Sequence, residues 1–198
     1  IQYVYLASEL TSAGASAGNI SSVAFNFTAL GGPAPANVNI KIGTTASTNL
    51  TSLTAGLTVY YTAATVTPTV GWNTYALSSS FYWDGTSNIL IEVCRDNAAW
   101  SGNYTVQTTQ FAVGVSRTFG YYTDGAAGCS ITSGSSASAA NRRHRPNIKF
   151  DISANTPCAT PTPGNTISSA NPVCSGASFT LSLQNATNGS GVTYLWQS

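Results

Sequence analysis

Charged side chains are scarce in this sequence. Of its 198 residues, seven are Lys or Arg, six are Asp or Glu and one is His, so 7% are charged, against about 25% in an average soluble domain. A nucleic-acid-binding surface needs several basic groups on one face to neutralise phosphates. General acid–base catalysis needs a positioned pair of titratable groups. We therefore expect neither a nucleic-acid-binding protein nor an enzyme.

Long apolar runs and methionine are also missing. A helix that crosses a bilayer needs about 20 consecutive apolar residues. Ser, Thr, Asn or Gly interrupts every apolar stretch here, so we expect no transmembrane segment. The chain starts at Ile1 without a charged-then-apolar leader. We therefore expect a mature, exported chain whose signal segment has been removed.

Four cysteines are present, Cys94, Cys129, Cys158 and Cys174. None has the spacing or the neighbouring histidine of a zinc site, so we expect disulfides and no bound metal. Disulfides place the chain in an oxidising compartment, secreted or at the cell surface. The first choice is a bridge between Cys94, at a strand end, and Cys129, in a Gly-rich loop. Cys174 would then pair with Cys158 or with a partner beyond Ser198.

Strand-forming residues in period-two alternation dominate the first part of the chain. The clearest strands are expected at 20–30, 38–42 and 88–94, and further ones at 2–6, 58–62, 72–77, 104–108, 113–122 and 147–152. Gly, Pro and Asp-Gly turns separate them. The segments 7–17 and 50–57 each have room for a short helical turn. The pattern predicts an all-β fold, a jelly-roll-like antiparallel β-sandwich.

Three regions are expected along the chain. The sandwich spans residues 1–152, long enough to bury about 68–70% of its unfolded surface. Residues 153–165 hold three prolines, no large apolar side chain and no charge, a composition typical of a stiff linker. Residues 166–198 offer strands near 167, at 178–183 and at 192–197. These do not close a sandwich, so we expect an incomplete β module that continues past Ser198 or is completed by another chain.

Two segments of the last region carry a resemblance. Residues 173–185 (VCSGASFTLSLQN) and 189–197 (GSGVTYLWQ) resemble the opening of immunoglobulin-like repeats in very large surface proteins of gliding bacteria with type IX secretion. This likeness covers roughly residue 158 to the end. Such a repeat should run on past Trp196 by several strands.

The first region resembles a sandwich domain that precedes such repeats, through residues 2–10, 72–73, 83–94 and 145–151. The resemblance implies secretion, surface exposure and adhesive or scaffolding work. It implies no catalytic residue.

Aromatic side chains near strand ends and turns give one candidate for ligand binding. Buried rings fill cores, and exposed rings can stack on the faces of sugars. Core packing is the first interpretation, and a glycan platform is the alternative. The set is Trp72, Trp83, Trp100, Tyr121 and Tyr122.

A basic run gives a second candidate. Arg142, Arg143, His144 and Arg145 hold three of the seven basic residues and the only histidine. The first interpretation is a solvated loop that enters the last strand, where charge protects a sheet edge from unwanted pairing. The alternative is a patch that binds anions or sulfated glycans.

The six carboxylates are not arranged as a catalytic pair in the sequence. Asp84 and Asp124 precede glycines in turns, and Glu92 alternates outward from the face that carries Ile91. A structural calcium ion could use loop aspartates, but the spacing of a calcium-binding loop is missing. We expect no cofactor. The six are Glu9, Asp84, Glu92, Asp96, Asp124 and Asp151.

These features predict a non-catalytic extracellular module with a structural or adhesive role. Its expected partners are copies of itself or a neighbouring surface protein, with glycans as a further option. Exposed strand edges beside a Pro-rich arm permit strand addition, and head-to-tail contacts of that kind build filaments. The alternative is a carbohydrate-binding accessory domain of a secreted hydrolase.

Overall fold

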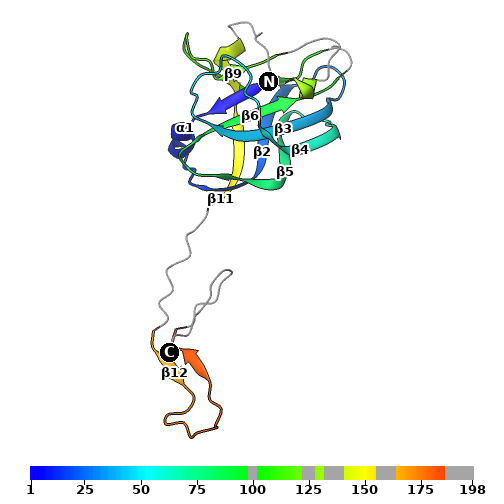
Figure 1. Cartoon of the computed structure of the whole chain (residues 1–198). Helices are drawn as coiled ribbons and strands as arrows, with labels where there is room; N and C mark the ends of the chain where they lie inside the picture. Colours follow the sequence, from blue (N-terminus) through cyan, green and yellow to red (C-terminus); the bar gives the residue numbers. More distant parts are fainter. Residues whose placement is uncertain (98–101, 122–127, 132–140, 155–163, 186–198) are drawn as a thin grey trace. The chain divides into compact units, whose positions relative to one another are not determined.

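The computed structural model describes residues 1–97, 102–121, 128–131, 141–154 and 164–185. The chain divides into two compact units, unit 1 (Ile1–Asn155) and unit 2 (Thr156–Ser198). The paired strands are antiparallel, and unit 1 packs two sheets face to face (Figure 1). The predicted all-β sandwich is confirmed.

The described strands of unit 1 are from two to thirteen residues long. They are β1 (Gln2–Tyr5), β2 (Gly18–Ala29), β3 (Ala36–Thr45), β4 (Thr58–Thr65), β5 (Gly71–Trp83), β6 (Asn88–Cys94), β7 (Thr105–Val106), β8 (Thr108–Gln110), β9 (Thr118–Phe119), β10 (His144–Pro146) and β11 (Ile148–Ala154). The short helical elements are α1 (Ala7–Ser12) and the 3₁₀ turns η1 (Gly128–Ser130) and η2 (Asn141–Arg143).

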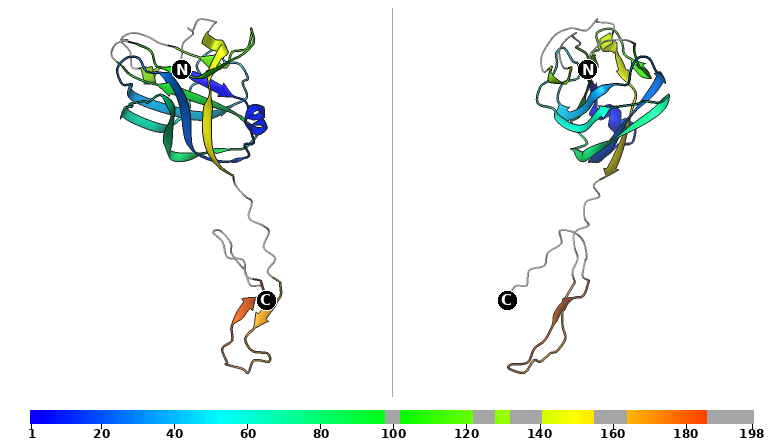
Figure 2. Two further views of the ribbon diagram at one scale, coloured as in Figure 1. Left: turned by 180° about the vertical axis from the view of Figure 1, so that it is seen from behind. Right: turned by 90° about the vertical axis from the view of Figure 1, so that its right-hand side faces the viewer.

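Two sheets form the sandwich. The five-stranded sheet has the order β4-β3-β6-β1-β9, and the four-stranded sheet has the order β11-β2-β5 with β7 also beside β2. A separate pair joins β8 and β10. Views from two further sides show β11, in yellow, running alongside β2, as its register requires (Figure 2).

The main core fills the space between the sheets. Alternate residues of β2, β3 and β6 point inward, among them Val23, Ile40 and Ile91, which are 0–1% exposed. Trp83, at the end of β5, is fully buried with them. Each such side chain contributes about 1.5–3 kcal/mol when it is removed from water, so the alternation that predicted these strands also drives the packing.

A second, smaller core covers the other face of the five-stranded sheet. Val4, Leu90 and Phe119 are buried there under Leu50, which belongs to the 46–57 segment between β3 and β4. Gly43 of β3 makes room for that segment, because a Cβ on it would lie 2.7 Å from a side-chain carbon of Leu57. Strands β1 and β6 are therefore buried on both faces.

The second core corrects one expectation. Glu92 does alternate away from Ile91, but it is only 6% exposed and does not face solvent. Alternation alone cannot show that the opposite face of a sheet is also covered. The segment 50–57 that provides this cover is not helical.

Helix α1 follows β1 directly and is held at its first turn. The Glu9 carboxylate accepts the N–H of Leu6 at 2.9 Å, and Asn88 Oδ1 accepts the N–H of Ala7 at 2.9 Å. Leu10 is buried against the main core. The short helix thus fixes the corner between β1 and β2.

Most predicted strands of unit 1 are present, with three differences. The expected strand at 113–122 is reduced to β9, and the unexpected strand β10 forms within the basic run. Strand β11 continues to Ala154, two residues into the range expected as linker, because Ser153 and Ala154 pair with the start of β2. Residues 155–163 of that range lie outside the described residues.

Unit 2 contains one hairpin among its described residues 164–185, formed by β12 (Thr166–Ser168) and β13 (Leu181–Leu183). No residue in this range is buried. Four large apolar side chains are 36–49% exposed, Ile167, Val173, Phe179 and Leu181. The strand expected at 192–197 lies outside the described residues.

Candidate functional site

The predicted bridge between Cys94 and Cys129 is present. It joins the end of β6 to η1, and Asp96 Oδ1 accepts the N–H of Cys129 at 2.8 Å. Cys158 lies outside the described residues. Cys174 is exposed and has no disulfide partner within the described ranges.

The structure separates the aromatic candidates. Trp83 is fully buried, and its Nε1–H donates to the carbonyl of Ser87 at 2.7 Å, so it belongs to the core. Trp72 is 39% exposed. Tyr121 is half-buried. Trp100 and Tyr122 lie outside the described residues.

Trp72 stands on the outer face of the four-stranded sheet. Lys149 of β11 reaches over it, with Nζ 4.2 Å from the ring centroid. Asn26, opposite Trp72 on β2, donates its side-chain N–H to Gln107 Oε1 at 2.8 Å. An exposed ring beside an amide pair and an ammonium group has the chemistry needed to stack on a sugar and hydrogen-bond its hydroxyls.

The basic run was expected to form a solvated loop, but Arg145 does not lie in one. Its side chain is 11% exposed and lies in β10. Nη1 donates to the carbonyl of Val4 at 2.8 Å and to Glu9 Oε2 at 2.7 Å. The guanidinium covers the ring of Tyr5. The flat guanidinium packs like an aromatic ring, which is why a charged run can lie against a core.

Of the neighbouring arginines, Arg142 and Arg117 also lie over aromatic rings, whereas Arg143 contacts a backbone carbonyl. Arg142 lies 5.1 Å from the centroid of Phe119, and Arg143 Nε donates to the carbonyl of Phe111 at 3.0 Å. Arg117, ahead of β9, lies over Phe111. His144 pairs with Gln110 across β10 and β8.

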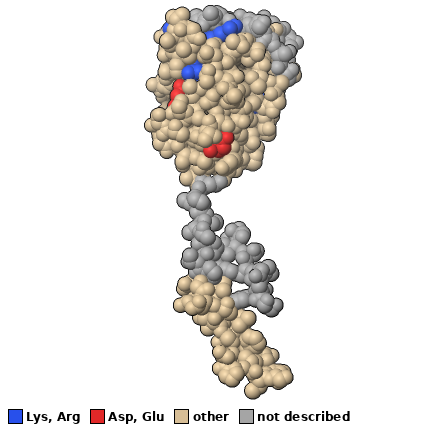
Figure 3. All heavy atoms as spheres, turned by 60° about the vertical axis from the view of Figure 1, so that its left-hand side comes forward, with Lys and Arg blue, Asp and Glu red and all other residues tan. Residues whose placement is uncertain are grey.

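These four arginines and Glu9 form a basic cluster at one end of unit 1. In the view of Figure 3 charged atoms are few: blue atoms lie in the upper part of unit 1, and red atoms lie beside and below them. Burial, with the charge of Arg145, lowers the pKa of Arg117. Burial raises the pKa of Glu9, but hydrogen bonds from Arg145 and Leu6 and the charge of Arg145 outweigh this and lower it overall.

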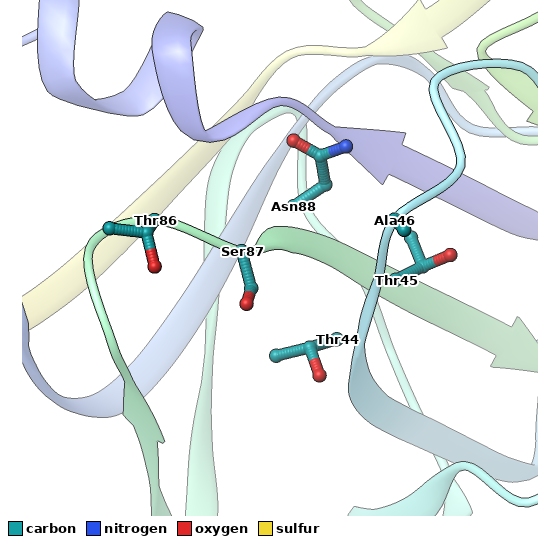
Figure 4. A pocket seen from close by; sticks show the side chains of 6 residues that line it. All are labelled: Thr44, Thr45, Ala46, Thr86, Ser87 and Asn88. Atoms are coloured by element: carbon teal, nitrogen blue, oxygen red, sulfur yellow. The ribbon is translucent and has the colours of Figure 1, made fainter.

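A shallow hollow of about 440 Å³ opens where the end of β3 meets the start of β6 (Figure 4). Its lining is neutral and mostly polar: Thr44, Thr45, Ala46, Thr86, Ser87 and Asn88. Asn88 also holds the turn beside it, donating to the carbonyl of Ser47 at 3.1 Å. The hollow offers hydroxyl groups but no charge.

Asp84 borders this region and is fully engaged by its own turn. Its carboxylate accepts the N–H groups of Thr86 and Ser87 at 2.8 and 2.7 Å and the Ser87 hydroxyl at 2.6 Å. These hydrogen bonds, that of the Ser87 hydroxyl first, lower the pKa of Asp84 to about 2. The Asp84 carboxylate thus stabilises its own turn. The Asp96 carboxylate accepts the backbone N–H of Cys129. Asp124, the third aspartate considered for calcium, lies outside the described residues.

One polar cluster was not singled out from the sequence. Glu92 accepts a hydrogen bond from Gln2 Nε2 at 2.7 Å and lies 2.6 Å from Lys41 Nζ. Its signal was present in the sequence, because Gln2, Lys41 and Glu92 are polar residues next to apolar ones in their strands. Sequence alternation placed Glu92 on an outer face, and only the second core shows that this face is covered.

The described residues contain no group of three or more His, Cys, Asp or Glu side chains that could hold a metal ion. Within the same ranges no helix is long and apolar enough to cross a membrane.

No protein-family model, curated protein or solved structure matches this chain.

Proposed function

We propose that the chain is a non-catalytic extracellular module with a structural or adhesive role, which makes contact with copies of itself through unit 2. The observation that carries this proposal is the β12–β13 hairpin. None of the described residues of unit 2 is buried, and the apolar side chains of Phe179 and Leu181 are 49% and 41% exposed. Exposed apolar side chains beside a strand edge favour contact with another surface.

The carboxylates of unit 1 support the non-catalytic part. Glu9 and Glu92 form ion pairs with arginine and lysine. Asp84 and Asp96 bind backbone N–H groups, and Asp151 accepts the hydroxyl of Ser21 at 3.0 Å. Each carboxylate in the described ranges thus has a structural partner. The disulfide supports the extracellular location, since such bonds persist in oxidising compartments.

Self-association is tested by replacing one apolar side chain of the hairpin. Phe179→Asp should reduce the fraction of oligomer seen in sedimentation velocity and the filaments seen in electron micrographs. Val113→Asp is the matched control, because Val113 is 85% exposed on unit 1 and should have no effect. A wild-type chain that stays monomeric at high concentration in both measurements would overturn the proposal.

A carbohydrate-binding role is the second candidate, and the surroundings of Trp72 favour it. Trp72→Ala should abolish the retardation of the protein in gels that contain a neutral polysaccharide. Tyr82→Ala is the control, because Tyr82 is a 54% exposed aromatic residue on the same strand, paired with Asn19 far from Lys149. Equal retardation of the wild type and the Trp72 variant would reject a platform at Trp72.

A further inference from the structure

Three polar side chains lie in one row across the five-stranded sheet. Glu92 of β6 is opposite Lys41 of β3 on one side and opposite Gln2 of β1 on the other. Lys41 Nζ lies 2.6 Å from Glu92 Oε1, and Gln2 Nε2 lies 2.7 Å from Glu92 Oε2. A primary amine and a carboxamide are therefore held against the two oxygens of one carboxylate.

The row is shielded from water. Gln2 is 0% exposed, Glu92 is 6% exposed, and the Lys41 side chain is 15% exposed. Stability alone is a weak reason to keep such a group, because apolar residues of similar volume often serve as well as a buried ion pair. An amine, a carboxylate and an amide enclosed together are instead the components of an acyl transfer.

The Gln2 amide is fixed and polarised by Thr54. Gln2 Oε1 accepts the N–H of Thr54 at 2.8 Å, and Nε2 donates to the carbonyl of the same residue at 2.8 Å. A backbone N–H on the carbonyl oxygen is the arrangement that stabilises the developing oxyanion in acyl transfer. The amide carbon of Gln2 is thereby prepared for attack by a nucleophile.

Space for a leaving group is present beside the row. A cavity of about 130 Å³ is lined by Lys41, Thr54 and Glu92, together with Ala55, Gly56, Leu57 and Ile131. A cavity of this size holds small molecules such as water, and ammonia is comparable in size.

We propose that Lys41 and Gln2 join in an intramolecular amide cross-link, with Glu92 transferring the proton. Glu92 takes a proton from the Lys41 ammonium, and the free amine attacks Cδ of Gln2, so that the Nζ–Cδ bond forms. Glu92 passes its proton to Nε2 as the Cδ–Nε2 bond breaks. Ammonia leaves and takes up the second proton lost by Nζ, becoming ammonium. The reaction needs no oxidant, reductant or second molecule.

The cross-link would tie β3 covalently to β1 across β6. It acts within one chain and therefore does not depend on the self-association proposed above. Because each chain reacts once with itself, it is also compatible with a module that turns over no substrate.

Mass spectrometry of the reduced, denatured chain tests the proposal directly. The wild type should be lighter than its sequence by one ammonia, and a protease digest should yield one branched peptide that contains both Gln2 and Lys41. The branched peptide is the decisive product, because Asn188-Gly189 can also lose ammonia by cyclising. A wild-type digest in which Gln2 and Lys41 occur only in separate linear peptides would overturn the proposal.

Two variants separate the roles of the groups. Lys41→Arg keeps a positive charge against Glu92 but offers no amine, so it should have the full mass. Glu92→Gln should form the branched peptide at least tenfold more slowly, and formation at the wild-type rate would overturn the role of Glu92. Lys149→Arg is the control and should cross-link fully. Should Glu92→Gln fail to fold, the wild-type digest still decides whether the bond exists.

Discussion

The guanidinium of Arg145 lies over the ring of Tyr5, with Cζ 4.3 Å from the ring centroid. The hydroxyl of the same tyrosine donates to the carbonyl of Pro146 at 2.9 Å. Two residues of β10 thus hold one side chain of β1, although 141 positions separate Tyr5 from Pro146. Burial, the largest cause, raises the pKa of Tyr5 well above its ordinary value, so the hydroxyl stays protonated and continues to donate.

We predict that Arg145→Ala destabilises unit 1 by about 2–3 kcal/mol, because it removes two charge-assisted hydrogen bonds and leaves Glu9 without its cation. Urea unfolding followed by tryptophan fluorescence measures the change. Lys149→Ala removes an exposed cation that also lies over a ring and should cost no more than about 0.5 kcal/mol. Similar losses in the two variants would contradict a structural role for Arg145.

The ion pair of Glu9 and Arg145 predicts sensitivity to acid. The folded-state pKa of Glu9 is lowered from its ordinary value of 4.5. Its stabilising effect is therefore present above pH 4.5 and is lost as the pH falls through the lower folded value. Unfolding free energies measured from pH 7 down to pH 2 should fall less steeply for Glu9→Gln than for the wild type. Parallel curves would show that Glu9 is not a source of the acid sensitivity.

Truncation of two tryptophans of one strand should destabilise unit 1 to very different extents. Trp83→Ala is expected to cost about 3–5 kcal/mol, because it leaves a large cavity in the main core and an unpaired carbonyl at Ser87. Trp72→Ala removes a partly exposed ring and should cost less than about 1 kcal/mol. Thermal unfolding of both variants distinguishes them, and a stable Trp83 variant would contradict the buried position.

Reduction of the Cys94–Cys129 bridge should weaken unit 1. The bridge closes a loop of 35 residues, which in the chain-entropy model contributes on the order of 3–4 kcal/mol. The double variant Cys94→Ala, Cys129→Ala should show that loss in urea unfolding under oxidising conditions. Cys174→Ser, in unit 2, should leave the unfolding of unit 1 unchanged. Equal stability of the double variant and the wild type would refute this contribution.

Much of the fold could be predicted from the sequence because its strands are amphipathic. The alternation of Ile89, Ile91 and Val93 gave the bounds of β6 without error. Such a pattern works where side chains of one face enter a single core. It also gave the approximate positions of β1 to β5 and of β11.

The pattern failed where contacts between distant segments decide the structure. Residues 113–117 alternate like a strand, yet Val115 donates to the carbonyl of Ala112 in a turn, and Arg117 donates to the carbonyl of Arg142. The basic run forms β10 because Arg145 finds an aromatic ring and a carboxylate, and neither lies near it in the sequence.

The roles of candidate residues were hardest to predict where they depend on solvent exposure of the side chain. Trp72 and Trp83 have similar positions in the sequence, each near a turn, but one is on an outer face and the other in the core. Glu92 was assigned to solvent because the covering segment 46–57 has no regular periodicity. Burial on two faces depends on a loop that no strand pattern describes.

The first and last strands of unit 1 lie in different sheets, β1 between β6 and β9, and β11 at the edge beside β2. A pulling force transmitted along the chain would therefore enter through the interior of one sheet and leave through the margin of the other. Strand β1 has antiparallel partners on both sides, so it would have to slide past both at once. Strand β11 has one partner in its sheet, and its end beyond Ile152 is the expected point where unit 1 begins to unravel under tension.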